Sequence, residues 1–571
     1  MTPDIDYSAL LPLLVVLATA IVSVLVEAFA PARARYVTQM AIYLGGLAAA
    51  LVAVVLLADT RLVTAEGAMA VDGPALFLQG ATVLVAIGAG LLIGERARVG
   101  ERARIAVGAG SPAGSRPRPP VLAGFAPQAA LAPGGDAERE AERAGVSQTE
   151  VFPLVLFGTG GLMLFPAAND LITLFIALEV LSLPLYVLCG MARRRRLLSQ
   201  EAAMKYFLLG AFSSAIFAYG IAMMYGYAGT VSFDGIAATV RAEGGSTLAL
   251  IGVAMMSVGL LFKVGAVPFH NWTPDVYQGA PTSITAFMAA GTKLAAFGAI
   301  LRFFYVAVPG LEEIWVPVLW AIAALTMIVG TVVGVTQNDV KRLLAYSSVA
   351  HAGFLLTGVL GPAEIGVTAT LFYLAAYAVS TVGVFAVAGL VRDPEGAEIT
   401  DLRSWAGLGR RQPLVAGAFA VLLLALAGIP LTSGFIAKFA VFSAAVDGGA
   451  VWLVVIGVLA SAIAASFYVR VIVVMFFRET PAGAGSGSAA GAGVAAGSGS
   501  AAGAGAPAAG SDAGAPGFGA DAGTADVAFA QRPATLAVVG VAVVITIALG
   551  IAPQPLLDLA GSAASMFAFA S

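Results

Sequence analysis

The chain has 571 residues, of which 59% are hydrophobic and only 11% are charged, with a formal net charge of −3. So little charge excludes a soluble globular protein, and apolar runs of about 20 residues, long enough to cross a bilayer, recur along the chain. The sequence therefore predicts an all-α polytopic membrane protein. The single cysteine, Cys189, excludes intrachain disulfides, iron–sulfur ligation and structural zinc, and two histidines leave little for another metal.

We predict about fourteen membrane spans from the apolar runs. They lie near residues 8–29, 36–58, 75–94, 151–168, 170–191, 203–228, 246–269, 280–306, 314–336, 342–360, 364–391, 412–445, 449–477 and 534–559. The N-terminal stretch has no basic region and no small-residue cleavage site. We therefore expect the first span to be a retained helix and not a signal peptide.

The loops after odd-numbered spans hold most of the basic residues. These are Arg33, Arg35, the arginines of 96–143, Arg193 to Arg196, Lys341, Arg342, the arginines of 392–411, Arg478 and Arg532. The opposite loops hold little beyond Arg61 and Arg241. Since basic loops stay in the cytoplasm, we expect the arginine-rich loops there and both termini outside.

Two segments resemble insertions. Residues 95–150 are rich in Arg, Pro, Gly and Ala, and residues 479–531 are low-complexity Gly/Ala/Ser. The first has no sustained apolar period, and the second cannot bury enough apolar surface to order itself, so we expect flexible, solvated cytoplasmic loops, with a docking site for a partner as the alternative. They separate N-terminal spans in 1–94, a central region that runs from 151 to 477, and a C-terminal span in 534–571.

Two of the spans are interrupted and carry a lysine. Span 7 is interrupted at Pro268 and holds Lys263; span 12 is interrupted at Gly428-Ile429-Pro430 and holds Lys438. Irregular backbone at membrane depth is tolerated only where protein or a water-filled cavity surrounds it. Five helices separate the two breaks, so spans 4–8 (151–306) and 9–13 (314–477) would form two inverted five-helix repeats, as in secondary transporters.

The lysines are placed unlike the arginines. Of thirty basic residues five are lysines, and Lys205, Lys263, Lys293 and Lys438 fall inside predicted spans. Arginine cannot lose its proton in a protein, whereas lysine can, so this pattern is typical of a protein that moves protons. A genome rich in GC would also replace loop lysines by arginine. That bias explains the arginines but not why lysines persist in the spans.

Glu179, near the middle of span 5, is the acidic partner that we predict for Lys263. Pairing would let the protonation state of each group control the other. The alternative is a static ion pair that holds helices together, and Lys293 and Lys438 have the same alternative. For Lys205, close to the cytoplasmic end of span 6, snorkelling to the interface is a stronger alternative.

Further polar residues lie near these lysines in the sequence. His270 could relay protons or cap free carbonyls, and His351 could relay protons or fill a packed hydrogen-bonding position. Asn338 and Asp339 signal a helix start, so Lys341 and Arg342 are expected to be interfacial anchors. Glu27, in span 1, has no predicted role. The sequence contains no phosphate loop, dinucleotide fingerprint or nucleophile arrangement.

These residues resemble a known family. The chain is similar to subunit N of the bacterial NADH-quinone oxidoreductase (respiratory complex I), one of its antiporter-like membrane subunits. The stretches that carry the resemblance are LEVLSLPLYVL (178–188), AAMKYFLLGAFSSA (202–215), LLFKVGAVPFHNWTPDVYQGAPTSITAF (260–287), QNDVKRLLAYSSVAHAGF (337–354) and GIPLTSGFIAKF (428–439). The motif WTPDVY in this chain differs from the WLPDAH-like motif of subunits L and M and of Mrp-type antiporters, and so favours subunit N.

The resemblance implies a proton channel in a bacterial inner membrane, coupled to quinone reduction in neighbouring subunits. It implies that Glu179 pairs with Lys263, that Lys293 links two half-channels, that Lys438 serves the outer half, and that Lys205 is typical of the subunit. NADH, flavin, iron–sulfur clusters and quinone would belong to partner subunits, with none bound by this chain. The partners would be other membrane subunits and the lipid bilayer, with no nucleic acid.

Two alternatives remain open at this point. The first is a subunit of an Mrp-type cation/proton antiporter, which has no redox coupling. The second is a scaffold subunit whose buried charges are static.

Overall fold

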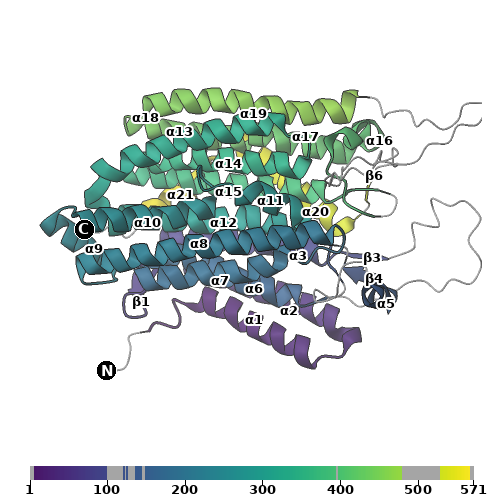
Figure 1. Cartoon of the computed structure of the whole chain (residues 1–571), viewed down its shortest axis with the longest axis horizontal. Coiled ribbons are helices and arrows are strands. Elements are labelled where there is room, and N and C mark those ends of the chain that lie inside the picture. The colour runs from purple at the N-terminus through teal and green to yellow at the C-terminus, as the bar shows by residue number, and fades with distance from the viewer. Residues whose placement is uncertain are drawn as a thin grey trace, which may run out of the picture.

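The computed structural model of the chain describes residues 5–98, 120–122, 124–126, 135–144, 148–393, 396–478, 528–530 and 532–565. Within these ranges, eleven helices are long and apolar enough to cross a membrane, and two shorter apolar helices, Val151–Ala167 and Pro413–Ala427, accompany them. The long helices run side by side as one bundle (Figure 1). The chain is therefore a mostly helical, multi-pass membrane protein.

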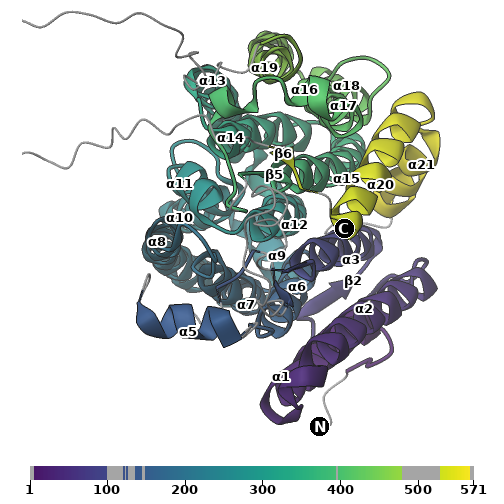
Figure 2. The ribbon, with the colours of Figure 1, turned by 90° about the vertical axis from the view of Figure 1, so that its right-hand side faces the viewer.

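The N-terminal part contributes three long helices at one side of the bundle (Figure 2). They are α1 (Leu11–Phe29), α2 (Ala32–Leu56) and α3 (Gly73–Ile93), with the hairpin of β1 (Leu62–Thr64) and β2 (Met69–Val71) before α3. The Asp72 carboxylate caps α3 by accepting from the backbone N–H of Ala75. Glu27, unassigned from the sequence, accepts hydrogen bonds from Arg35, Gln39 and Thr149, and so ties α1 to α2 and to the segment before α6.

The central region falls into two series of helices. The first holds α6 (Val151–Leu164), η1 (Phe165–Ala167), α7 (Leu171–Cys189), α8 (Arg196–Ala228), α9 (Phe233–Glu243), α10 (Thr247–Val264), α11 (Trp272–Gly279), α12 (Thr282–Arg302) and the π-helical turn η2 (Phe303–Ala307). The second holds η3 (Pro309–Leu311), α13 (Glu312–Thr336), α14 (Val340–Val359), α15 (Ala363–Ala388), η4 (Leu402–Trp405), α16 (Leu408–Arg411), α17 (Pro413–Ala427), α18 (Ser433–Asp447) and α19 (Val451–Phe477).

The C-terminal segment is two helices and not one. The predicted span 534–559 is corrected to α20 (Pro533–Ile551) and a separate helix α21 (Gln554–Ser565). Pro553 lies between them and Pro555 lies in the first turn of α21, so α20 cannot continue through this stretch, because proline in a helix interior lacks a donor and clashes with the preceding turn. α21 packs against α3 and α15.

Part of the predicted loop 95–150 has regular structure. β3 (Arg96–Arg98) pairs antiparallel with β4 (Pro120–Leu122), and α5 (Asp136–Ala144) follows. These elements lie at the end of the bundle where α16 and β6 also lie, opposite α9 and β1 (Figure 1). Apart from β6 (Ala528–Phe529), which pairs with β5 (Val391–Arg392), and Ala530, the predicted loop 479–531 falls outside the described residues.

Two helices occupy the centre of the bundle. The apolar stretch of α12 is entirely buried by other parts of the chain, and that of α15 is 89% buried, whereas α1, α2, α19 and α20 are each about one-third buried. Figure 2 shows α12 and α15 surrounded by the other helices. A polar side chain on α12 or on a neighbour's inner face is therefore shielded from lipid by protein.

Candidate functional site

The break in the first series begins at a glycine. α10 ends at Val264 because Gly265 adopts a φ of +73°, which favours glycine, so the last helical residue is four positions before the predicted break at Pro268. Pro268 lies within the interruption that separates α10 from α11. Side chains provide hydrogen-bond partners for backbone groups that lose their helical partners at the break. Trp272 Nε1 donates to the Phe262 carbonyl, and Val267 N–H donates to Thr326 Oγ1 on α13.

The break in the second series has the same construction. α17 ends at Ala427, followed by Gly428 with a φ of +83°, and α18 begins at Ser433. Pro430 lies inside the interruption, as predicted from the sequence. In both cases a left-handed glycine ends the first half-helix and leaves carbonyl groups of its last turn without helical partners.

A buried lysine bonds to the last carbonyl of each of these half-helices. Lys293, on α12, donates to the Val264 carbonyl at 2.8 Å, and Lys438, on α18, donates to the Ala427 carbonyl at 2.8 Å. Lys438 also donates to Ser461 Oγ on α19 at 2.8 Å. The negative end of a helix dipole and its free carbonyls favour a cation. Each break is therefore a site for a lysine ammonium group.

Lys263, in the last turn of α10, is 2% exposed and has a different partner from the one predicted. Its Nζ donates to Ser182 Oγ on α7 at 2.6 Å, and no ion pair within 4.0 Å joins it to Glu179. Glu179 Oε1 is buried without a hydrogen-bond partner. The two groups are not in direct contact: Ser182, which shares a face of α7 with Glu179 at i+3, is the group that contacts the lysine. The pairing of Glu179 with Lys263 through their charges stays a prediction.

Lys205 lies in an exposed charge cluster. Its Nζ is 2.7 Å from Glu201 Oε1 and 2.9 Å from Asp275 Oδ2, and its side chain is 43% exposed. Asp275, on α11, also pairs with Arg342 of α14 at 2.6 Å. The sequence reasoning missed Asp275, although its place in the broken span, in WTPDVY, was a usable signal.

His351 joins a network of hydroxyl groups between α14, α15 and α19. Its Nδ1 lies 2.8 Å from Tyr373 Oη and its Nε2 lies 3.4 Å from Tyr468 Oη. One turn earlier on α14, Ser348 Oγ accepts from Tyr377 Oη at 2.9 Å and lies 3.3 Å from Tyr277 Oη. The tyrosines were missed; the i, i+4 spacing on α15 was the signal that could have found two of them.

His270 lies outside this network. It is half-buried, its Nδ1 has no hydrogen-bond partner, and its ring centroid is 6.4 Å from that of Tyr346. No hydrogen bond or ion pair connects it to Lys263 or Lys293. Among the described residues, no group of three or more His, Cys, Asp and Glu side chains is arranged to hold a metal ion.

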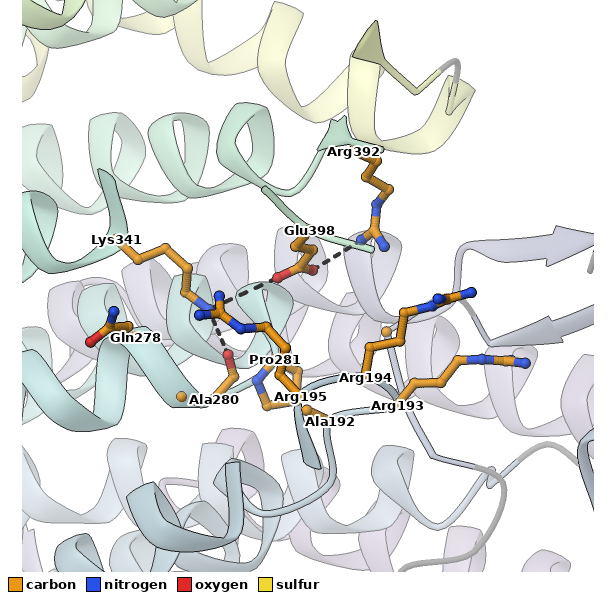
Figure 3. A pocket seen from close by; sticks show the side chains of 12 residues that line it. Ala192, Arg193, Arg194, Arg195, Gln278, Ala280, Pro281, Lys341, Arg392 and Glu398 are labelled. Atoms are coloured by element: carbon orange, nitrogen blue, oxygen red, sulfur yellow. Dashed lines mark hydrogen bonds and ion pairs between the residues drawn. The ribbon is translucent and has the colours of Figure 1, made fainter. Parts of the chain in front are cut away.

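Lys341 is not the interfacial anchor that the sequence predicted. Asp339 caps α14, as expected, but Lys341 is only 2% exposed. Its Nζ donates to the Ala280 carbonyl at 2.6 Å and lies 4.0 Å from Glu398 Oε2 (Figure 3). The segment after α15 folds over the start of α14, which local sequence patterns do not reveal.

Buried lysines placed at helix breaks define a class of membrane protein that binds or moves cations, and the comparisons with known proteins agree. The model of the NADH:quinone oxidoreductase/Mrp antiporter transmembrane family matches residues 168–464. NADH-quinone oxidoreductase subunit N of Rhodococcus opacus is 57% identical over 99% of this chain and 97% of that protein. The same subunit of Mycobacterium tuberculosis is 52% identical over 99% of both chains.

Solved structures show the same architecture. A chain of respiratory complex I from Thermus thermophilus aligns with a TM-score of 0.69 at 28% identity, over 96% of this chain and 99% of that one. A chain of the Mrp complex from Dietzia aligns with a TM-score of 0.72 at 24% identity, which shows a shared fold. The chain belongs to the family of NADH-quinone oxidoreductase subunit N.

Proposed function

We propose that this chain is the proton-translocating membrane subunit of an NADH-quinone oxidoreductase, in which Lys263, Lys293 and Lys438 carry the protons. One observation supports this most directly: the three lysines are 2–5% exposed and none has a carboxylate within 4.0 Å in the described part of the chain. A static buried ion pair would show both partners. A lysine held by carbonyl and hydroxyl oxygens can gain and lose its proton, which arginine cannot.

The contacts support an order for the transfer. Glu179 and Ser182 lie on one face of α7, and Ser182 contacts Lys263. Lys293 holds the carbonyl of Val264, the residue next to Lys263. The hydroxyl network around His351 reaches toward both lysines: the Tyr377 ring centroid lies 5.9 Å from Lys293 Nζ, and Tyr468 lies on α19, which also carries Ser461, the hydroxyl partner of Lys438. In this proposal Glu179 sets the charge at Lys263, Lys293 connects the two halves, and Lys438 releases the proton outward.

Lys205 and His270 have lesser parts in this proposal. The ion pairs of Lys205 with Glu201 and Asp275 support a role at the entrance to the first series of helices. They do not support a place in the buried row, by which we mean Lys263, Lys293 and Lys438. We assign His270 a relay role at the first break, close to Pro268, where its Nδ1 is buried.

The fourteen-span arrangement with two inverted repeats belongs to the same proposal. Its support is the matching construction of the breaks: α10–α11 and α17–α18 are each interrupted after a glycine of positive φ. The arginine-rich end would face the cytoplasm and both termini would lie outside, in a bacterial inner membrane.

The redox chemistry would take place in partner subunits. NADH, flavin, iron–sulfur clusters and quinone would be held there, and electron transfer would act on this chain electrostatically. Other membrane subunits of the complex and lipid would cover the apolar faces of helices such as α8, α13 and α19, which expose large hydrophobic side chains.

The proposal is tested by finding the assembly that holds the chain. A tagged copy is expressed in its own membranes, gently solubilised and run on a native gel that is stained for NADH oxidation. We expect the tag in a large NADH-oxidising band. Migration in an assembly without NADH activity, together with sodium-dependent proton exchange in vesicles, would instead indicate Mrp-type antiport. Normal pumping without Glu179 and the three buried lysines would indicate a scaffold.

A further inference from the structure

Glu398, in the segment after α15, lies between two small cavities at the arginine-rich end of the bundle. Each cavity has a volume of about 30 Å³, and Glu398, Arg392 and Gly124 line both. A water molecule needs roughly 10–15 Å³ measured in this way, plus polar partners, so each cavity can hold water. Figure 3 shows the carboxylate of Glu398 directed toward Lys341 and Arg392.

The carboxylate of Glu398 is held at the start of the helix that bears Lys293. Thr282, the first residue of α12, donates to its Oε2 at 2.5 Å, and Arg392 Nη2 lies 2.9 Å from its Oε1. Lys341 Nζ is 4.0 Å from Oε2, a separation that a side-chain rotation or a bridging water closes. Burial acts to raise the pKa of Glu398, but the charges of Arg392 and Lys341 hold that pKa below its ordinary value.

Lys341 repeats the arrangement of the buried lysines of the membrane interior. Lys293 and Lys438 donate to the last carbonyls of α10 and α17, and Lys341 donates to the carbonyl of Ala280, the residue that follows α11. Lys341 is likewise almost fully buried. It therefore shares with them a cation site at a helix end, displaced toward the arginine-rich end of the bundle.

A chain of hydroxyl groups leads from Lys341 toward Lys293. Ser348 is seven residues further along α14, on the same face and about 10 Å up the helix. Its Oγ contacts Tyr277 Oη and Tyr377 Oη. The ring of Tyr377 lies 5.9 Å from Lys293 Nζ. Ser348, Tyr277 and Tyr377 thus lie between the water-sized cavities and Lys293, with about 10 Å separating Lys341 from Ser348 along the helix.

We propose that Glu398 and Lys341 form the entry site through which this subunit takes up protons from the arginine-rich side. This inference rests on the proposed function. The carboxylate of Glu398 accepts a proton from a water in the adjoining cavity and becomes a carboxylic acid. It returns to a carboxylate when it gives that proton to the neutral amine of Lys341. Lys341 becomes neutral by passing its previous proton inward, by way of the Ser348 hydroxyl, to the neutral amine of Lys293.

The charged groups around the pair come from several elements. They are Arg392 after α15, Arg193, Arg194 and Arg195 before α8, Asp339 before α14 and Arg532 before α20. The thiol of Cys189, the last residue of α7, also faces Lys341. These groups keep the entry site positive, so a proton that reaches Glu398 is driven onward and does not accumulate there. The arrangement takes no ligand other than water and a proton.

The test uses everted membrane vesicles with the whole complex, because their arginine-rich side then faces the buffer. NADH-driven acidification is measured from pH 6 to pH 8 for the native protein, Glu398→Gln, Lys341→Met and the conservative Glu398→Asp. Glu313→Gln, an exposed carboxylate at the start of α13, is the matched control. NADH oxidation and a native gel report electron transfer and assembly.

We expect Glu398→Gln and Lys341→Met to lose pumping at every pH, because each removes a proton carrier from the entry route. The loss should grow from about twofold near pH 6 to about tenfold at pH 8, where uptake from dilute protons limits the rate. Glu398→Asp keeps most of the native profile. A native profile in Glu398→Gln, or an equal loss at every pH as a structural role would give, overturns the inference. Lys263→Met, measured alongside, separates the two proposals. If Lys263→Met pumps normally, the proposed function fails. If Lys263→Met loses pumping while Glu398→Gln and Lys341→Met keep the native profile, the proposed entry site is wrong.

Should Glu398→Gln not assemble, the profile of Lys341→Met decides. That variant leaves the Glu398–Arg392 ion pair and the Thr282 hydrogen bond in place. A flat loss across the pH range in Lys341→Met counts against the entry site.

Discussion

Lys263 Nζ donates its hydrogen bond to Ser182 Oγ, at 2.6 Å, and not to the carboxylate of Glu179. A hydroxyl can accept from the charged lysine and donate to the neutral one, so Ser182 is suited to both protonation states. In the structure the Ser182 hydroxyl accepts from Lys263 and donates to the Leu178 carbonyl of its own helix, so it links the lysine to α7 through a neutral group.

The first prediction concerns Ser182. Ser182→Ala removes a hydrogen bond to a charged group, worth about 1.5–3 kcal/mol, so we expect NADH-driven pumping to fall about tenfold or more. Ser182→Thr, which keeps the hydroxyl, should retain most of the rate. Ser257→Ala, on α10, is the control, because Ser257 bonds only to the Val253 carbonyl of its own helix. Pumping in vesicles measures all three, and native rates in Ser182→Ala would remove Ser182 from the route.

The second prediction concerns the glycine that ends α17. Gly428 has a φ of +83°, and an added Cβ would lie 2.9 Å from Lys438 Cδ and 3.3 Å from its Nζ. Gly428→Ala should therefore cost about 1–2 kcal/mol in strain and displace Lys438, with a several-fold loss of pumping. Gly417→Ala, on the same helix, meets nothing within 4 Å and should leave pumping unchanged. Equal rates in the two variants would argue against the capping role of Lys438.

The third prediction concerns the buried ion pair of Arg302 and Asp72. Arg302 Nη2 lies 2.7 and 2.8 Å from the two Asp72 oxygens, both side chains are 1% exposed, and Arg302 Nε donates to the Pro166 carbonyl. The pair joins α12 to the start of α3. Asp72→Asn keeps the helix cap but removes the carboxylate charge that Arg302 faces, so we expect a loss of about 3–5 kcal/mol.

Thermal unfolding of the purified subunit in detergent measures this loss. A thiol-reactive dye reports it, because the single cysteine, Cys189, is fully buried until the chain unfolds. Asp72→Asn combined with Arg302→Met leaves no buried charge at this position and should recover part of the lost free energy of unfolding. If the double variant is no more stable than Asp72→Asn, the ion pair is not the source of the loss.

The fourth prediction concerns the acid sensitivity of the Glu398 contacts. The pKa of Glu398 is lowered in the folded chain, with burial opposing and Arg392 and Lys341 favouring its charged form. A lowered folded pKa contributes stability that is present above the unfolded pKa, near 4.5, and is lost as pH falls through the folded value. Thermal unfolding between pH 7 and pH 3 should show a drop at the acid end that is smaller in Glu398→Gln. Identical acid profiles would contradict this.

The sequence predicted the buried lysines and the interrupted helices because both depend on local chemistry. A lysine within an apolar run must face protein, and the structure places Lys263, Lys293 and Lys438 in the interior. Glycine and proline mark the interruptions, although at the first one the helix ends at Gly265, ahead of Pro268. The fold class followed from composition and apolar runs in the same way.

The remaining features depend on contacts between distant segments. Glu398 covers Lys341 from 57 positions further along the chain, so a helix-start signal at Asp339 wrongly indicated an interfacial anchor. The partner of Lys263 depends on the side-chain geometry of α7, which spacing does not define. The carbonyls that hold Lys293 and Lys438 become acceptors only once the half-helices have ended. Pro553 and Pro555, by contrast, were a local signal for α21 that the span prediction overlooked.

The measurement that tests the central claim most directly is the number of protons moved per electron in the assembled complex. Proton release and NADH oxidation are recorded together in vesicles for the native protein, for Lys263→Met, Lys293→Met and Lys438→Met, and for the triple variant. We predict that each single variant lowers the ratio and that the triple variant lowers it no further than the most affected single one, because the three lysines act in series. An unchanged ratio in an assembled triple variant would contradict proton transfer through this row.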